Sequence, residues 1–201
     1  MTRTLSPGPL IAATHNKGKV KELKALFEPL GFTVTSAIEL DLEEPEETEK
    51  TFAGNAALKA LAAARTTGKP ALSDDSGLEV FALNGQPGIY SARWAGEPRS
   101  FENAMKRVED ELKAKNTDDY SARFVCALAI GWPDGHSEIF KGEVRGHLEF
   151  PARGDQGFGY DPIFVANGET ITIGEMAPDK KHAMSHRADA FVKLKTMLEG
   201  I

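Results

Sequence analysis

The chain has 201 residues, of which 41% are hydrophobic and 27% charged, as is ordinary for a globular protein with a real core. Its formal net charge of -6 argues against a surface for duplex nucleic acid, although a local basic pocket remains compatible with it. The longest uncharged apolar run, residues 124–132, is too short to cross a bilayer, and residues 1–9 lack the apolar core of a secretory signal. The single cysteine, Cys126, cannot form an internal disulfide, which fits a reducing cytoplasm. Together with the net charge and the short apolar run, this predicts a cytoplasmic protein without nucleic acid or membrane partners.

The first part of the chain predicts a strand, a polar loop and a helix. Residues 10–14 are apolar, residues 15–19 are polar, and apolar residues then recur at helical spacing until Gly31. This layout can hold a phosphate at the start of the helix, with Lys17 and Lys19 as counter-charges. The loop lacks the glycines of a Walker A sequence, and a solvated loop is the simpler interpretation of these lysines alone.

A second strand candidate and an acidic run follow. Residues 32–35 fit a short strand, and residues 41–49 carry a series of carboxylates. Such runs are usually solvated faces, and this one leads into a helix that Thr51 can cap. Asn55 and Lys59 are four residues apart, so they share one face of that helix.

Two adjacent carboxylates, Asp74 and Asp75, stand in the middle of the run 71–80. Neighbouring side chains of a strand point to opposite sides, so both can face one ligand only if the strand ends there. Gly77 permits the bend that such an end requires. The pair would then form a hard oxygen site of the type that Mg²⁺ prefers. The alternative is an Asx turn between two strands.

The remainder of the chain alternates turns, helices and strands. The expected elements are a hairpin turn at 84–85, a helix over 100–115, a buried strand over 122–131, a strand pair over 137–148, a glycine-rich loop over 153–162 and a last helix opened by 180–182 and 185–187. The glycine-rich loop can either stack on a flat ligand or be a decorated hairpin. Together these elements predict one α/β domain over residues 1–201 with a mixed β-sheet.

Seven short motifs occur in one order along almost the whole chain. They are Thr14–Lys19, Glu46–Thr48, Thr51–Phe52 with Asn55 and Lys59, Asp74–Leu78, Pro87–Arg93, Gly157–Pro162 and Ser185–Arg187. Each motif is weak by itself, but seven in register are specific. In this respect the chain resembles the inosine/xanthosine triphosphate pyrophosphatase family, which removes deaminated purine nucleotides.

The resemblance implies a reaction and an architecture. The reaction is Mg²⁺-dependent hydrolysis of non-standard purine nucleoside triphosphates (ITP, dITP and XTP) to the monophosphate and pyrophosphate. The architecture is an elongated mixed β-sheet flanked by helices, with two lobes around a central cleft, usually in a homodimer.

Residue roles follow from the motif positions. Asp75 would be the general base and a metal ligand, and either Glu46 or Glu47 would complete the metal site. The other implied residues bind substrate: Thr14, His15, Asn16, Lys17, Gly18 and Lys19 at the triphosphate, Ser76 at the substrate, Phe158, Gly159, Tyr160 and Asp161 at the base and sugar, and Lys181, His186 and Arg187 at the nucleotide again.

One departure from the family pattern lies near the implied metal site. Glu49 stands where the family usually has glycine, so the backbone of the acidic run can differ there. A second departure, Gly174 in place of alanine, should change only local flexibility.

Two other functions fit the sequence less well. A phosphatase with Asp74 or Asp75 as nucleophile lacks the expected Asp-x-Asp spacing. A nucleotide-sensing or RNA-binding module is disfavoured by the net charge and the clustered carboxylates.

Overall fold

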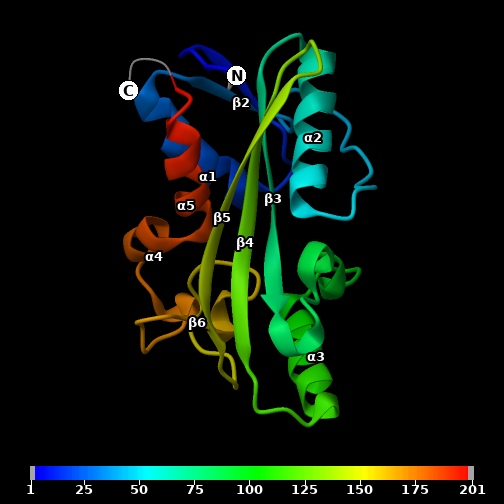
Figure 1. Cartoon of the computed structure of the whole chain (residues 1–201), viewed down its shortest axis with the longest axis vertical. Helices are drawn as coiled ribbons and strands as arrows, with labels where there is room; N and C mark the ends of the chain where they lie inside the picture. Colours follow the sequence, from blue (N-terminus) through cyan, green and yellow to red (C-terminus); the bar gives the residue numbers. More distant parts are fainter. Residues whose placement is uncertain (1–2, 199–201) are drawn as a thin grey trace. The chain divides into compact units, whose positions relative to one another are not determined.

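A computed structural model describes residues 3–198, apart from the side chain of His182. Within this range one six-stranded sheet has the order β2-β1-β3-β4-β5-β6 (Figure 1). The strands are β1 (Pro9–Ala12), β2 (Thr33–Ser36), β3 (Ala71–Val80), β4 (Ser121–Gly131), β5 (Ser137–Leu148) and β6 (Phe164–Ala166). The α-helices are α1 (Lys17–Phe27), α2 (Phe52–Thr67), α3 (Phe101–Lys115), α4 (Pro178–Met184) and α5 (His186–Lys195).

The pairing of the strands makes the sheet mixed. Strand β1 pairs in parallel with β2 and with β3, whereas β5 and β6 pair antiparallel. The predicted α/β fold with a mixed sheet is therefore confirmed. None of the helices within residues 3–198 is both long and apolar enough to cross a membrane.

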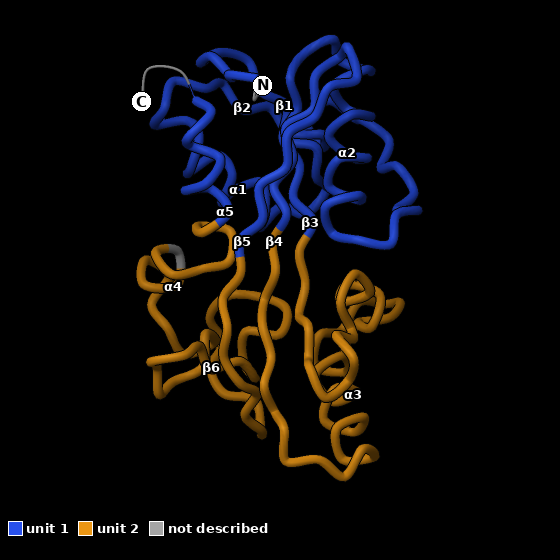
Figure 2. The backbone as a smooth tube through the Cα atoms, viewed as in Figure 1, with its two compact units in different colours: residues 1–75, 127–142, 190–201 blue, residues 76–126, 143–189 orange. Residues whose placement is uncertain are grey.

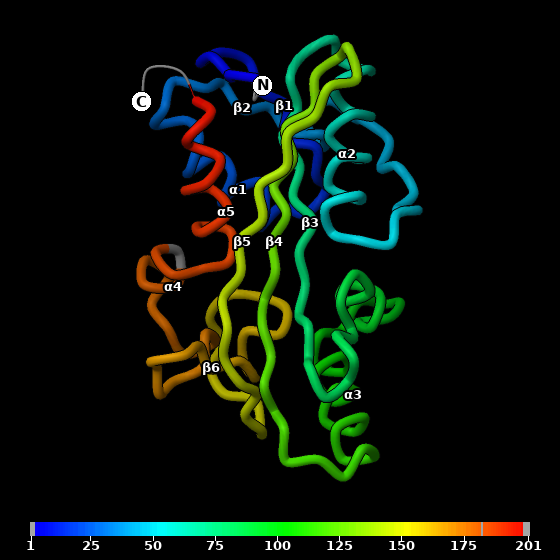
Figure 3. The backbone as a smooth tube through the Cα atoms, in the orientation of Figure 1, coloured from blue at the N-terminus to red at the C-terminus, as the bar shows by residue number. Residues whose placement is uncertain are grey.

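The chain divides into two compact units (Figure 2). The first comprises the residues up to 75, residues 127–142 and the residues from 190 on; the second comprises residues 76–126 and 143–189. Strand β1 and the end of α5 thus belong to the same first unit, and Figure 3 follows the chain between them by colour. There the ring of Phe27 on α1 meets the ring of Phe191 on α5 edge to face, with 5.1 Å between the centroids.

Helix α2 packs in the first unit through small side chains. Thr51 caps it, because its hydroxyl accepts a hydrogen bond from the amide of Gly54 at 3.0 Å. The buried face is mostly alanine (Ala56, Ala60, Ala63 and Ala64). A Cβ atom added at Gly131 of β4 would lie 2.8 Å from the carbonyl carbon of Ala60, so the helix and the strand can approach this closely only with glycine there.

The second unit has its own core. Ala104, Val108 and Leu112 form the buried stripe of α3, as the periodicity of that segment predicts. They pack in one cluster with residues of β3, β4 and β6, among them Leu78 and Phe164.

Three predicted elements were wrong. The run 71–80 contains no turn, because β3 continues through it as one strand of 10 residues. The segment 137–148 is the single strand β5 rather than a strand pair. Its Gly146 marks a close approach to β6, since a Cβ atom there would lie 2.0 Å from the carbonyl oxygen of Val165.

The third difference concerns the last helix. Lys180 and Lys181 lie in a separate helix, α4, which begins at Pro178. Ser185 has extended backbone angles (φ -72°, ψ 155°) and separates α4 from α5. Its hydroxyl accepts a hydrogen bond from the amide of Ala188 at 3.1 Å, so Ser185 caps the start of α5.

Candidate active site

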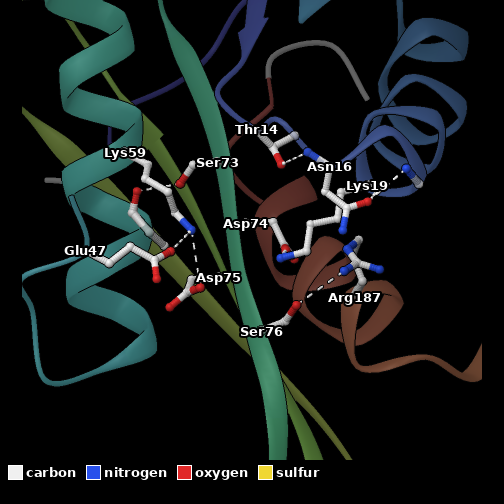
Figure 4. A network of polar contacts seen from close by, with 12 residues as sticks. Thr14, Asn16, Lys19, Glu47, Lys59, Ser73, Asp74, Asp75, Ser76 and Arg187 are labelled. Carbon is white, nitrogen blue, oxygen red and sulfur yellow. Dashed lines mark hydrogen bonds and ion pairs between the residues drawn. The ribbon is translucent and has the colours of Figure 1, made fainter. Parts of the chain in front are cut away.

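Strand β3 sends its two adjacent carboxylates to opposite faces. Asp75 points toward α2, where its Oδ1 lies 3.2 Å from Nζ of Lys59. Asp74 points the other way and forms an ion pair with Lys19 of α1 (Figure 4). The expectation that both aspartates face one ligand at a strand end is therefore wrong, because the strand does not end there. Of this pair, only Asp75 belongs to the candidate metal and base site.

The ammonium group of Lys59 joins two carboxylates. It donates to Oε1 of Glu47 at 2.7 Å and to Oδ1 of Asp75 at 3.2 Å. The residue that precedes Glu47, Glu46, is exposed to solvent. Of the two acids that the sequence left as alternatives, Glu47 is the one that lies beside Asp75 on the shared lysine, and the identity of the metal ligand stays a prediction.

The surroundings of Asp75 oppose its charge. The side chain is buried, and this burial raises the pKa of its carboxyl group, although Lys59 and Lys19 act in the opposite direction. Burial alone would lower the pKa of Lys59, but the nearby carboxylates of Asp75 and Glu47 outweigh it and raise that pKa. A buried carboxylate with a raised pKa, held by a cation, has the properties of a general base.

The same carboxylates fit a divalent cation. Oδ2 of Asp75 is buried and has no hydrogen-bond partner among the described residues, so one acceptor is left for a ligand. Within residues 3–198, no three His, Cys, Asp or Glu side chains form a group that could hold a metal. Glu47 and Asp75 would therefore supply two carboxylates and leave other positions to phosphate oxygens and water, which is the usual arrangement for Mg²⁺.

The loop before α1 is ordered by its own side chains. Oδ1 of Asn16 accepts from the amides of Gly18 at 2.9 Å and Lys19 at 3.2 Å, which caps the helix. Oγ1 of Thr14 accepts from the amide of Asn16 at 3.2 Å. Lys17 and Gly18 are exposed, so a phosphate group can reach them from solvent.

His15 lies in this loop but turns toward the acidic run. Its Nε2 is 2.7 Å from the carbonyl oxygen of Leu42, and its Nδ1 is 3.9 Å from a carboxylate oxygen of Glu44. His15 also lines a cavity of about 400 Å³ whose rim includes Asp41, Glu43 and Glu44. Lys59, the lysine shared by Glu47 and Asp75, lines the same cavity, and a role of His15 at the triphosphate stays a prediction.

A second set of predicted residues meets within the second unit. Oδ2 of Asp161 accepts from the amide of Phe158 at 2.8 Å and from Nζ of Lys181 at 2.7 Å. The same Nζ lies 4.6 Å from the centroid of the Phe158 ring, a cation–π distance. Gly157 has φ +81°, and a Cβ atom there would fall 2.2 Å from Oδ2 of Asp161. The loop therefore requires glycine at this position.

The two aromatic residues of that loop differ in exposure. Phe158 is 39% exposed, so its ring can stack on a flat ligand. Tyr160 is 2% exposed; its hydroxyl donates to the carbonyl oxygen of Ser91 at 2.8 Å, and its ring packs edge to face on Phe101. Burial raises the pKa of Tyr160, and the ring belongs to the core. Phe158, which follows Gly157, is the ring available to a base.

The start of α5 places the last predicted residues. Arg187 is buried, and its Nη2 lies 3.5 Å from Oγ of Ser76 (Figure 4). His186 stacks on Phe124 of β4, with 5.2 Å between the ring centroids and 18° between the planes. That these residues read the nucleotide stays a prediction.

The position of Lys59 is the main feature that the sequence left without a role. Its spacing from Asn55 placed the two on one helix face, and both are buried there. The signal was a lysine on a helical stripe made mostly of alanines, since a buried lysine requires a carboxylate partner.

Comparisons with known proteins extend over nearly the whole chain. A sequence model of the Ham1 family matches residues 10–197. The dITP/XTP pyrophosphatase of Caulobacter vibrioides is 56% identical over 189 residues, which cover 94% of this chain and 97% of that protein. The protein of the same name from Rhodospirillum centenum is 56% identical over 193 residues, with coverages of 96% and 95%.

Solved structures of Ham1 proteins are also similar over nearly the whole chain. A HAM1 protein from Coxiella burnetii superposes with a TM-score of 0.87 and 37% identity, and the match covers 94% of this chain and 96% of that one. The Ham1 protein of Staphylococcus aureus gives a TM-score of 0.84 and 40% identity, with the same coverages of 94% and 96%.

Proposed function

Because the chain belongs to the Ham1 family, we propose that it is a nucleoside triphosphate pyrophosphatase of the dITP/XTP type. It hydrolyses ITP, dITP and XTP to the corresponding monophosphate and pyrophosphate, and so removes deaminated purines from the nucleotide pool.

The observation that carries this proposal is the environment of Asp75. Its buried carboxylate shares Lys59 with Glu47 and keeps one oxygen without a hydrogen-bond partner among residues 3–198. A structural ion pair would not need an unsatisfied buried acceptor, which costs free energy. A water molecule or a cation at that oxygen would remove the cost, and hydrolysis requires both.

In the proposed reaction Asp75 acts as general base. It accepts a proton from water while the water oxygen attacks phosphorus; the anhydride bond between the α- and β-phosphates breaks, and pyrophosphate leaves. Glu47 and Asp75 would hold Mg²⁺, which would neutralise charge on the phosphates and act as a Lewis acid. Lys17 and Lys19 would add positive charge at the triphosphate.

The role of Lys19 differs from that of an isolated cation. Its ammonium group is already paired with the buried Asp74, so the pair as a whole is neutral. We infer that Asp74 fixes the lysine in a conformation from which its remaining hydrogen-bond donors reach a phosphate. Lys17, which is exposed, would contribute a full positive charge.

Base choice would depend on the second set of residues. Hypoxanthine and xanthine carry a 6-oxo acceptor beside an N1–H donor, whereas adenine reverses this pair. Stacking on Phe158 would not discriminate between purine bases. Selection of the base would therefore require hydrogen bonds, for which His186 and Arg187 are the candidates. A site matched to the 6-oxo pattern can disfavour adenine by roughly 10⁴-fold. GTP shares the 6-oxo group and should be a poor substrate through its 2-amino group, with ATP poorer still.

The test is pyrophosphate release from dITP, ITP, XTP, GTP and ATP, each with Mg²⁺ and with excess chelator. We expect release from the first three at the highest kcat/KM, and none above background with chelator. Release of inorganic phosphate instead of pyrophosphate would indicate a phosphatase. Binding without any product would leave only a nucleotide-binding role. Either result would overturn the proposal.

A further inference from the structure

We propose that Asn55 is a positioning residue for Glu47: it holds the irregular acidic segment so that this carboxylate stays beside Asp75. The inference rests on the metal site of the proposed function. It concerns a residue that would touch neither the metal nor the substrate.

The segment that carries Glu47 has no regular structure to hold it. No helix or strand lies between Ser36, where β2 ends, and Phe52, where α2 begins, and the structure describes all of this stretch. A carboxylate in such a segment would sample many positions unless other groups fixed the backbone. Contacts with other elements must therefore restrain the backbone near Glu47.

Asn55 supplies one within two residues of Glu47. Its Oδ1 accepts a hydrogen bond from the backbone amide of Glu49 at 3.0 Å. Asn55 is 1% exposed, so losing this bond would leave a buried polar group unsatisfied. Because each residue spans at most about 3.5 Å, fixing the amide of Glu49 also confines Glu47 to a small volume.

Asn55 and Lys59 act as a pair on one face of α2. Asn55 holds the backbone at Glu49, and one helical turn later Lys59 holds the carboxylate of Glu47 at 2.7 Å. The hydroxyl of Ser73 on β3 donates to the carbonyl oxygen of Ala56, which ties this part of the helix to the strand that bears Asp75. Glu47 and Asp75 are therefore placed from the same turn of α2.

The side chain of Glu49 adds a second contact with the helix. It lies over Gly54, where an added Cβ atom would be 2.7 Å from Cβ of Glu49 and 3.2 Å from its Oε2. Glycine at position 54 thus makes room for glutamate at position 49. The hydrogen bond to Asn55 uses the backbone amide of residue 49, so it does not depend on the glutamate side chain.

The experiment measures Mn²⁺ binding to the nucleotide-free protein by electron paramagnetic resonance, with Asn55→Ala, Asn55→Asp and Thr51→Ala. Asn55→Ala should weaken Mn²⁺ binding by roughly 10- to 100-fold, as loss of a supporting group usually does. Asn55→Asp keeps the acceptor oxygen and should stay much closer to wild type. Thr51→Ala removes the cap of the same helix end and should lower the melting temperature without weakening Mn²⁺ binding.

Kinetics then separate positioning from a general structural defect. Asn55→Ala should raise the Mg²⁺ concentration needed for half-maximal activity by a similar factor, with kcat at saturating Mg²⁺ close to wild type. The inference is wrong if Asn55→Ala binds Mn²⁺ as tightly as wild type, if Asn55→Asp is as weak as Asn55→Ala, or if Thr51→Ala weakens binding equally. If the wild type binds Mn²⁺ but hydrolyses no nucleotide, the proposed function fails while the binding test of Asn55 still decides this inference.

Discussion

Asp75 is 7% exposed, and its carboxylate lies between a lysine that favours its charge and an interior that opposes it. The desolvation that raises its pKa is a cost to folding and an advantage for a base. Lys59 stabilises the ionised carboxylate through a hydrogen bond to Oδ1 and leaves Oδ2 without a hydrogen-bond partner among the described residues. The residue thus combines partial stabilisation with an oxygen left available for chemistry.

Replacing Asp75 by Asn should abolish most of the activity. The amide keeps the size of the side chain but accepts no proton and binds a cation weakly, so kcat should fall by on the order of 10²-fold or more. Asp134→Asn, a change at an exposed aspartate of the β4–β5 turn, is the matched control. Pyrophosphate release at saturating Mg²⁺ measures both, and near-normal turnover by Asp75→Asn would remove Asp75 from the role of base.

In the absence of metal, the same variant should differ from wild type in how its stability depends on pH. Because the pKa of Asp75 is raised on folding, the folded chain holds this proton more strongly than the unfolded chain, and stability is lost as pH rises from the ordinary value near 4. Asp75→Asn escapes this loss, so it should gain stability relative to wild type as pH rises from 4 to 7; loss of the carboxylate partner of Lys59 is a separate cost. This relative gain should shrink as pH falls toward 4.

Thermal unfolding with chelator at several pH values gives the measurement. An advantage that grows toward acid pH would mean that the pKa of Asp75 is lowered on folding. Adding Mg²⁺ should stabilise wild type and leave Asp75→Asn nearly unchanged, because only wild type keeps both carboxylates.

The glycine-rich loop of the second unit depends on a backbone that other residues do not readily adopt. Gly157 has φ +81°, and a side chain there would collide with Asp161 and approach Nζ of Lys181 to 2.9 Å. Gly157→Ala should therefore break the Asp161–Lys181 pair and displace Phe158. We expect kcat/KM for ITP to fall by roughly 10-fold or more, the loss expected from misplacing substrate-binding groups.

Gly168→Ala is the matched control for this change. Gly168 also has a positive φ, +87°, but no atom lies within 4 Å of the added Cβ. Both variants should lose stability from backbone strain, roughly 1 kcal/mol each. Only Gly157→Ala should lose activity, and equal activity in the two variants would remove this loop from the substrate site.

Helix α2 offers a test of the contact between Glu49 and Gly54. Gly54→Ala alone should destabilise the protein, because the new Cβ would lie 2.7 Å from Cβ of Glu49. With Glu49→Gly already present the clash is gone, and Gly54→Ala should instead stabilise by up to about 1 kcal/mol, the helix propensity of alanine over glycine. A double-mutant cycle by urea unfolding measures this coupling, and additive effects would contradict it.

Element types followed from the sequence wherever the periodicity was strong. The helix that Thr51 caps and the helix expected over 100–115 were confirmed as α2 and α3. The failures came from residues with two meanings. Gly77 was expected to bend the chain but lies inside β3, because the pairing of β3 with strands distant in sequence decides whether a glycine marks a turn.

At the candidate site, too, the sequence predicted some features and the folded structure decided the others. Motif order placed Asp75 and Glu47 among the candidates, but only the fold paired both with Lys59. The family resemblance assigned Tyr160 to the base and sugar by its motif position, whereas its exposure of 2% places the ring in the core. Which of two adjacent side chains faces the core is a property of packing that local sequence does not determine.

At the scale of the whole molecule, the chain passes between its two compact units within β3, β4, β5 and α5. These crossings lie inside regular elements and not in linkers, so unfolding of one unit should propagate into the other through shared strands. The formal net charge of -6 would keep single chains apart at low ionic strength unless a specific surface joins them.

The family resemblance predicts a homodimer. Sedimentation equilibrium should therefore give about twice the 21.8 kDa mass of one chain, independent of concentration in the micromolar range. A species of single-chain mass over the same range would show that this member of the family acts as a monomer.

The alternation of side chains along β3 restricts which insertions and deletions this strand can accept during evolution. Asp75 meets Lys59 on one face and Asp74 meets Lys19 on the other, with Ser73 bonded to α2 on the same side as Asp75. Inserting one residue before Asp74 would move Asp74 into the place of Asp75 beside Lys59, and Asp75 into the place of Ser76. The inserted residue would then face Lys19, so one ion pair would be lost and the residue beside Glu47 would no longer be the one that precedes Ser76. Variation in this strand should therefore occur by substitution at fixed length, and length changes should be confined to the loops that flank it.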